Sequence, residues 1–194
     1  MIKLAIVYHS GFGHTQRVAE CVAEGAAAVE NTQVAVQSVD RVDLETLHAA
    51  DAIVFGAPTY MGGLSAPFKS FMESTSKLWL QQRWKDKLAA GFTNSGSLYG
   101  DKSIALGELS CFAAQHGMLW ISLGMLVAGV RGDRDDPRHL NRLGSSLGLM
   151  TQADVDRGPD LAPPISDLET ARAFGRRIAG LAARWSAGKA GSRG

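Results

Sequence analysis

Short apolar runs alternate with segments of helical periodicity along the first two thirds of the chain. The runs are brief and rich in Val, Ile and Ala, which is typical of strands buried on both faces. They predict five strands, at residues 2–8, 34–39, 52–56, 88–93 and 118–123. Helical patterns lie between them, beginning at His14, Asp43, Pro67 and Ser103. Because parallel neighbours need crossover connections, this alternation predicts an α/β fold: a doubly wound, five-stranded parallel sheet with helices on both faces.

The last third of the chain carries a weaker pattern. From about residue 124 the periodicity gives way to Gly, Pro, Asp and Arg, so we expect residues 126–164 to form a long loop whose role the sequence does not reveal. Ser166 and Glu169 have the spacing of a capping box and predict the start of a closing helix. We therefore expect one domain over residues 1–186, followed by a flexible tail over 187–194.

Composition narrows the class of protein. The chain has 194 residues, of which 45% are hydrophobic and 20% charged, with a net charge of +1. These values indicate an ordinary globular domain. Its charge is too small to attract the phosphate backbone of a nucleic acid, and we expect no membrane-spanning segment. Cys21 and Cys111 lack CxxC spacing, so we expect two buried thiols and no thiolate metal site. Met1 leads directly into a strand pattern without a secretory signal, which favours the cytoplasm.

The segment after the first predicted strand has the chemistry of a phosphate site. Hydroxyls, glycines and the first turn of a helix come together in Ser10-Gly11-Phe12-Gly13-His14-Thr15. Free N–H groups and the helix dipole favour an anion at such a place. The third glycine of a dinucleotide fingerprint and the Gly-Lys-Ser/Thr of a Walker loop are absent. The alternative is a plain glycine turn with Thr15 as a cap.

Two more loops end at the same edge of the predicted sheet, where ligands bind in open parallel sheets. The loop after the third strand combines an aromatic ring and a thioether with glycine, in Pro58-Thr59-Tyr60-Met61-Gly62. The loop after the fourth strand offers hydroxyl, amide and backbone donors, in Thr93-Asn94-Ser95-Gly96-Ser97. Such groups suit a flat ring with polar edges. Taken singly, each loop is also compatible with ordinary surface turns.

With His116-Gly117-Met118, these motifs resemble the flavodoxin-like NAD(P)H:quinone oxidoreductases of the WrbA type, within the FMN reductase and flavodoxin group. The resemblance covers roughly residues 2–125 and the closing helix. It implies that residues 10–15 hold the FMN phosphate and that residues 59–61 and 94–99, which include Leu98 and Tyr99, surround the isoalloxazine. Pro58, Gly62 and Thr93 are expected to bind the cofactor as well. It also implies that His116 is catalytic and reaches the pyrimidine edge. By the same resemblance Phe12 lies near the nicotinamide and Trp79 lines the substrate pocket, often from a neighbouring subunit.

The leading interpretation is therefore an enzyme that passes a hydride from NADH or NADPH through FMN to a quinone-like acceptor, as a homodimer or homotetramer. One alternative is a flavodoxin that carries electrons between proteins, although carriers are generally acidic and this chain is near neutral. Another is a non-catalytic scaffold, against which the intact loops argue. His9 and His14 have no evident third ligand, so no metal is expected. Without the resemblance, His116 would be a helix-end histidine.

Overall fold

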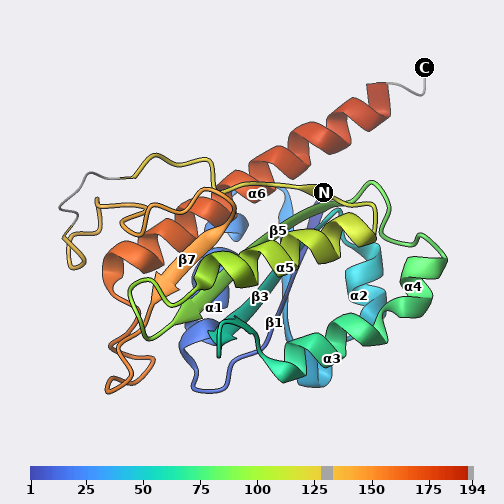
Figure 1. Cartoon of the computed structure of the whole chain (residues 1–194). Helices are drawn as coiled ribbons and strands as arrows, with labels where there is room; N and C mark the ends of the chain where they lie inside the picture. Colours follow the sequence, from blue (N-terminus) through green and yellow to red (C-terminus); the bar gives the residue numbers. More distant parts are fainter. Residues whose placement is uncertain (128–132, 192–194) are drawn as a thin grey trace.

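The computed structural model describes residues 1–127 and 133–191, and it has three layers (Figure 1). A central sheet has the strand order β2-β1-β3-β5-β6, with β4 beside β3 and β7 beside β5. Helices cover both faces, as the sequence predicts. In chain order the elements are β1 (Ile2–Tyr8), α1 (His14–Ala27), β2 (Thr32–Ser38), η1 (Val39–Arg41), α2 (Leu44–Ala49), β3 (Ala52–Tyr60), β4 (Gly63–Leu64), α3 (Ala66–Ser74), α4 (Ser76–Leu80), β5 (Leu88–Ser95), α5 (Lys102–Gln115), β6 (Leu119–Trp120), β7 (Leu149–Gln152) and α6 (Ile165–Gly191).

Two apolar clusters hold the layers together. One packs α1 and α6 against the sheet, around Val22, Phe92 and Phe174, and the other packs α3 and α5 against the opposite face, around Phe55 and Leu109. The inner strands β1, β3 and β5 are buried along nearly their whole length, which explains their continuous apolar runs. The edge strand β2 is only partly buried, and its sequence is correspondingly more polar.

The predicted fifth strand is split. Only Leu119–Trp120 pairs with the start of β5, and the chain then leaves the sheet. It returns as β7, which pairs in parallel with Phe92–Ser95 further along the same strand. The long loop predicted over residues 126–164 is therefore wrong at β7. This short strand was missed because it lies among glycines and its burial alternates over only four residues.

Three smaller expectations are corrected. Cys21 is buried as predicted, but Cys111 is exposed on α5. Ser166 lies inside α6 and its hydroxyl donates to the main-chain oxygen of Arg134, so it is not the expected cap. The helix also continues to Gly191, past the predicted boundary at 186, and residues 192–194 of the predicted tail lie outside the described residues.

Within residues 1–127 and 133–191, no helix combines the length and apolarity needed to cross a bilayer. The cytoplasmic location stays a prediction.

Candidate functional site

The three predicted loops meet at one cavity. Parallel pairing of β1 with β3 and of β3 with β5 brings the carboxyl ends of these strands to the same edge of the sheet. A cavity of about 530 Å³ opens there, within the usual range for small-molecule sites. Its walls come from four segments: Ser10, Phe12, His14 and Thr15; Pro58, Thr59 and Tyr60; Asn94, Ser95 and Gly96; and Ala153, Val155, Arg157 and Gly158.

The first segment is built to accept an anion. Gly13 precedes α1 with φ of 87°, and among the described residues no side chain caps the helix. The first-turn N–H groups therefore have no partner within the helix, and the helix dipole points at the cavity. The Ser10 hydroxyl is buried and has no hydrogen-bond partner among the described residues. Thr15 lies inside α1 and is not a cap, so a plain capped turn does not describe this loop.

Aromatic side chains form the rim. Phe12 is 75% exposed, and its ring meets that of Tyr60 edge to face with centroids 6.3 Å apart. A Cβ on Gly11 would lie only 2.6 Å from the Tyr60 hydroxyl, so this glycine allows the Tyr60 side chain to approach the loop. Partial burial raises the pKa of Tyr60, which keeps the phenol neutral at physiological pH. The rim can cover one side of a flat ring.

The segment after β3 is a hairpin and not the open loop that the sequence predicts. The strand itself continues through Pro58, Thr59 and Tyr60, and the last two residues pair with β4. Met61 and Gly62 form the two-residue turn, both with positive φ, as type I′ hairpins require. Met61 is fully exposed at the tip, so neither turn residue lines the cavity.

The loop predicted after residue 93 begins inside β5, which runs to Ser95, and its residues divide in two. Thr93 is buried behind the cavity, where its hydroxyl lies 2.7 Å from that of Thr59, and the side-chain oxygen of Asn94 accepts from the Thr151 hydroxyl. These bonds fix the end of β5. Ser95 and Gly96 line the cavity, whereas Leu98 and Tyr99 line a neighbouring one of about 320 Å³ and Ser97 lines neither.

A fourth wall was missed by the sequence interpretation. The chain beyond β7 folds over the first segment, and the Nε2 of His14 donates to the main-chain oxygen of Arg157 at 2.8 Å. A Cβ on Gly96 would lie 2.4 Å from a methyl carbon of Val155. This wall follows strand β7, which the sequence pattern did not predict. The turn-type residues around Gly158 are the sequence signal that could have indicated a loop here.

His116 lies at the opposite edge of the sheet, beside the start of β5. It follows α5 and precedes β6, which pairs with Leu88 and Ala89, whereas the cavity begins at Asn94. Six residues of strand span about 20 Å. The structure thus does not bring His116 to the cavity of its own chain.

The surroundings of His116 are those of a packed core residue. It is 4% exposed, its ring lies 4.5 Å from that of Trp84, and its Nε2 is 2.9 Å from the Thr75 hydroxyl. Since Thr75 already donates to the Met72 carbonyl, Nε2 must carry the proton. Burial lowers the pKa of His116 to about 4, so the ring is neutral near pH 7. Trp79, 47% exposed, shares with it a shallow cavity of about 230 Å³.

His9, which follows β1, also has a protein partner. His9 shares a 2.8 Å hydrogen bond with Ser65, and burial lowers its pKa. Among residues 1–127 and 133–191, no cluster of three His, Cys, Asp or Glu could hold a metal ion.

Residues 9–130, which include three of the four walls, match the model of the family described as NADPH-dependent FMN reductase. The chain belongs to this family. It is 41% identical over 180 residues to Flavodoxin FldP of Pseudomonas aeruginosa, covering 92% of this chain and 96% of the relative. It is 29% identical to an NAD(P)H dehydrogenase (quinone) of Paracoccus denitrificans, covering 97% and 98%.

A solved structure agrees in fold. The crystal structure of a flavodoxin, WrbA-like protein from Agrobacterium tumefaciens aligns with a TM-score of 0.74 and 39% identity, covering 95% of this chain and 99% of that one. The flavodoxin-like fold and the WrbA-type resemblance predicted from the sequence are confirmed.

Proposed function

We propose that the protein is an FMN-dependent oxidoreductase that passes a hydride from NADH or NADPH to a quinone or a similar small acceptor. The observation that carries the proposal is the anion-ready first segment, in which the buried, unpartnered Ser10 hydroxyl and the uncapped start of α1 face one cavity. A cofactor with a phosphate and a flat ring fits this combination. The family match and the relatives named as quinone dehydrogenases support the choice of FMN.

Each part of the cavity would bind a different part of FMN. Ser10, Gly11 and Gly13, with the first-turn N–H groups of His14 and Thr15, hold the phosphate, while Phe12 and Tyr60 cover the ring. Pro58 and Thr59 shape the floor, and the polar groups of Asn94, Ser95 and Gly96 face the polar ring edge. FMN, when bound, supplies the hydride chemistry. The protein's part is to orient the reactants and exclude water.

Phe12 is placed to act on the substrate. Its ring is largely exposed at the mouth of the cavity, where a nicotinamide or a quinone would have to stack to exchange a hydride with the cofactor. Both reactants are flat, so one exposed aromatic side chain can serve each in turn.

His116 and Trp79 can serve this reaction only from a second copy of the chain. They lie together at the far edge of the sheet, and Trp79 is exposed there. We include in the proposal a homodimer or homotetramer in which the Trp79 surface of one copy closes the cavity of another. His116 then lines the same shallow cavity as Trp79 and is neutral near pH 7.

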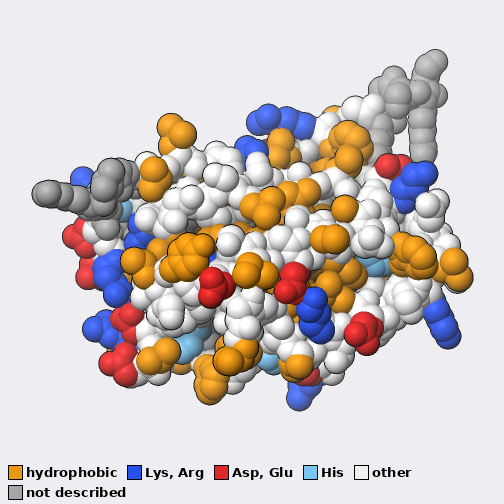
Figure 2. Space-filling view, viewed as in Figure 1, with side chains coloured by type: hydrophobic (Ala, Val, Ile, Leu, Met, Phe, Trp, Pro, Cys, Tyr) orange, Lys and Arg blue, Asp and Glu red, His pale blue; other side chains and the backbone are white. Residues whose placement is uncertain are grey.

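A flavodoxin carrier is the second candidate, because the chain is 41% identical to a relative named as a flavodoxin. The charges of this chain favour the enzyme over the carrier. The net charge is +1, and acidic and basic side chains are interspersed on the face shown in Figure 2. A docking surface for charged protein partners would concentrate one sign.

FMN binding tests the first step of this proposal. Titration of the apoprotein with FMN should quench the flavin fluorescence at a one-to-one ratio, and Ser10→Ala should bind more weakly by about tenfold, as expected for the loss of a hydrogen bond to a charged group. Ser70→Ala is the matched control, since the Ser70 hydroxyl donates to the Ala66 carbonyl of its own helix. Equal affinity of the Ser10 variant and the wild type would remove this loop from the site.

A further inference from the structure

A buried lysine lies directly behind the third wall of the cavity. Lys102 is the first residue of α5 and is 1% exposed. Its ammonium group donates to the Ser95 hydroxyl at 2.8 Å and to the main-chain oxygen of Ser97 at 2.6 Å. The lysine is thus hydrogen-bonded to the residues on both sides of Gly96, Ser95 and Ser97.

The position runs against two general preferences. Lysine is almost never fully buried, and a cation at a helix N-terminus opposes the helix dipole. Burial lowers the pKa of Lys102 to about 8, so the group is mostly charged at pH 7. Residues that break local rules in this way are expected at functional sites.

The turn is shaped to admit the ammonium group. Gly100 and Asp101 both have positive φ, and a Cβ on Gly100 would lie 2.3 Å from the Ser95 hydroxyl oxygen. Only glycine lets residues 95–101 curl this tightly around the lysine.

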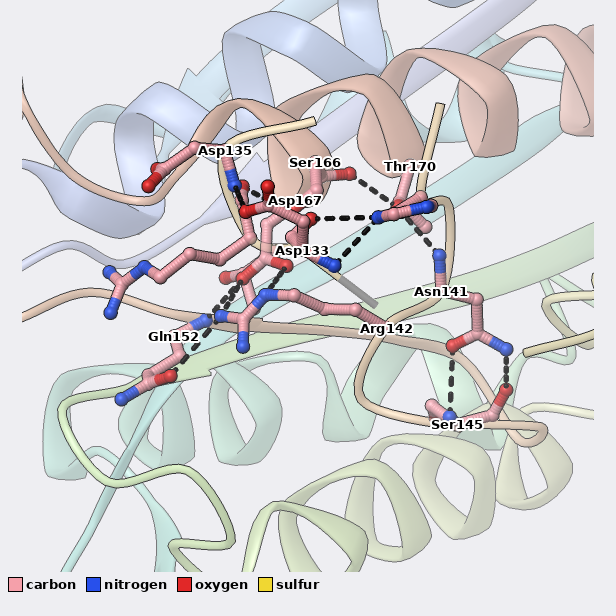
Figure 3. A network of polar contacts seen from close by, with 12 residues as sticks. Asp133, Asp135, Asn141, Arg142, Ser145, Gln152, Ser166, Asp167 and Thr170 are labelled. Carbon is pink, nitrogen blue, oxygen red and sulfur yellow. Dashed lines mark hydrogen bonds and ion pairs between the residues drawn. The ribbon is translucent and has the colours of Figure 1, made fainter. Parts of the chain in front are cut away.

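A second anchor holds the middle of the turn. The Gln152 side chain donates to the Gly96 oxygen at 3.2 Å, and its own side-chain oxygen accepts from Arg142 at 3.1 Å. Arg142 forms a bidentate ion pair with Asp167 at 2.7 and 3.0 Å, and Asp167 also accepts from the Gln152 N–H. Figure 3 shows this network, which joins β7 to the start of α6.

Peptide geometry then orients the opposite side of the turn. In a trans peptide the C=O and the following N–H point in opposite directions. With the Gly96 and Ser97 oxygens turned toward Gln152 and Lys102, the N–H groups of Ser97 and Leu98 point away from them. Neither N–H has an acceptor among the described residues.

We propose that Lys102 is a positioning residue for the cofactor: it fixes the 95–101 turn, whose Ser95 and Gly96 line the cavity, and places a positive charge behind that turn. The proposal rests on the FMN-binding function above. A turn backed by a positive charge favours a ligand edge that gains negative charge, as the flavin edge does on reduction.

The test compares Lys102→Met with Lys87→Met. Lys87 is the matched control because its ammonium also donates to two main-chain oxygens, those of His48 and Ala50, but at the amino edge of the sheet. In the ligand-free proteins, amide hydrogen exchange of Ala153, whose N–H donates to the Ser95 oxygen at 3.1 Å, should be at least tenfold faster in the Lys102 variant and unchanged in the Lys87 variant. Should Lys102→Met fail to fold, Lys102→Gln, which keeps a donor and removes the charge, takes its place.

FMN then provides the second readout. Lys102→Met should bind FMN at least tenfold more weakly, with a more negative midpoint potential for the bound flavin, and Lys102→Arg should restore part of the potential. Lys87→Met should change neither quantity. Wild-type exchange, affinity and potential in Lys102→Met would overturn the proposal. If the wild type itself does not bind FMN, the proposed function fails, whereas the exchange comparison still decides whether Lys102 positions the turn.

Discussion

The Nε2 of His14 lies 2.8 Å from the main-chain oxygen of Arg157, 143 residues further along the chain. The bond joins the residue that opens α1 to the segment that follows β7. Beside it, a Cβ on Gly13 would lie 2.9 Å from Cγ of Pro159. The phosphate-type loop and the fourth wall are therefore one packed unit, and changes in either should be felt by a ligand in the cavity.

Gly13→Ala should weaken FMN binding by roughly tenfold or more. The added Cβ meets Pro159, and a φ of 87° is unfavourable for alanine by about 1–2 kcal/mol. Gly107→Ala is the control: outside its own helix backbone and chain neighbours, none of the described residues comes within 4 Å of its Cβ position in the middle of α5. The variant should therefore be more stable by about 0.5–1 kcal/mol. Fluorescence titration and urea unfolding measure the two effects. Unchanged FMN affinity in the Gly13 variant would separate this loop from the ligand.

Arg142→Met should lower the free energy of unfolding by about 3–5 kcal/mol, because it leaves the buried Asp167 carboxylate without its counter-ion. The two side chains are only 7% and 2% exposed. The double variant Arg142→Met with Asp167→Leu should lose less than the sum of the two single changes. Urea denaturation of the four proteins gives the coupling energy, and strictly additive losses would contradict a tight buried pair.

Lys102 should make stability depend on pH above neutrality. Its pKa is about 8 in the folded protein and near 10.5 when exposed, so between these values the unfolded chain holds a proton that the folded chain lacks. The free energy of unfolding therefore rises with pH across this window, by up to about 1.4 kcal/mol per pH unit from this group. The wild type should gain stability relative to Lys102→Met between pH 7.5 and 9.5. Parallel pH profiles of the two proteins would be inconsistent with a buried charged lysine.

Trp79→Ala should weaken self-association and slow acceptor reduction while leaving the fold almost unchanged, since the indole is 47% exposed. Sedimentation and turnover measured over a dilution series check both effects. Leu126→Ala, at another exposed apolar side chain, is the control. A wild type that is monomeric and fully active at all dilutions would exclude a shared pocket, and with it any role for His116 in the reaction.

The alternation of apolar runs and helical stripes was sufficient to predict the layers, because buried parallel strands leave a strong pattern. Strand β7 has no such sequence pattern, since it spans only four residues and its position is set by pairing with β5. The fourth wall of the cavity was lost with it. The role of His116 was taken from the resemblance alone, whereas a residue that follows a helix and precedes a parallel strand lies at the amino ends of the strands, away from the cavity of its own chain.

The loop chemistry was predicted better than its geometry. Ser10, Phe12, Tyr60 and Asn94 all line the cavity. Met61 does not, because the turn chemistry of a two-residue hairpin moves it to the tip. Lys102 escaped notice, since a lysine near a loop is ordinarily a solvated residue and only the structure shows it buried.

We expect FMN bound in this one cavity to take a hydride from a nicotinamide and to deliver it to a small acceptor. Under anaerobic conditions, NADPH or NADH added to the FMN-loaded protein should bleach the flavin absorbance, and a quinone added afterwards should restore it, both in stopped-flow records fast enough to account for steady-state turnover. Flavin that is not reduced by either nucleotide, or that is reoxidised only by protein redox partners, would contradict the enzyme and favour the electron carrier.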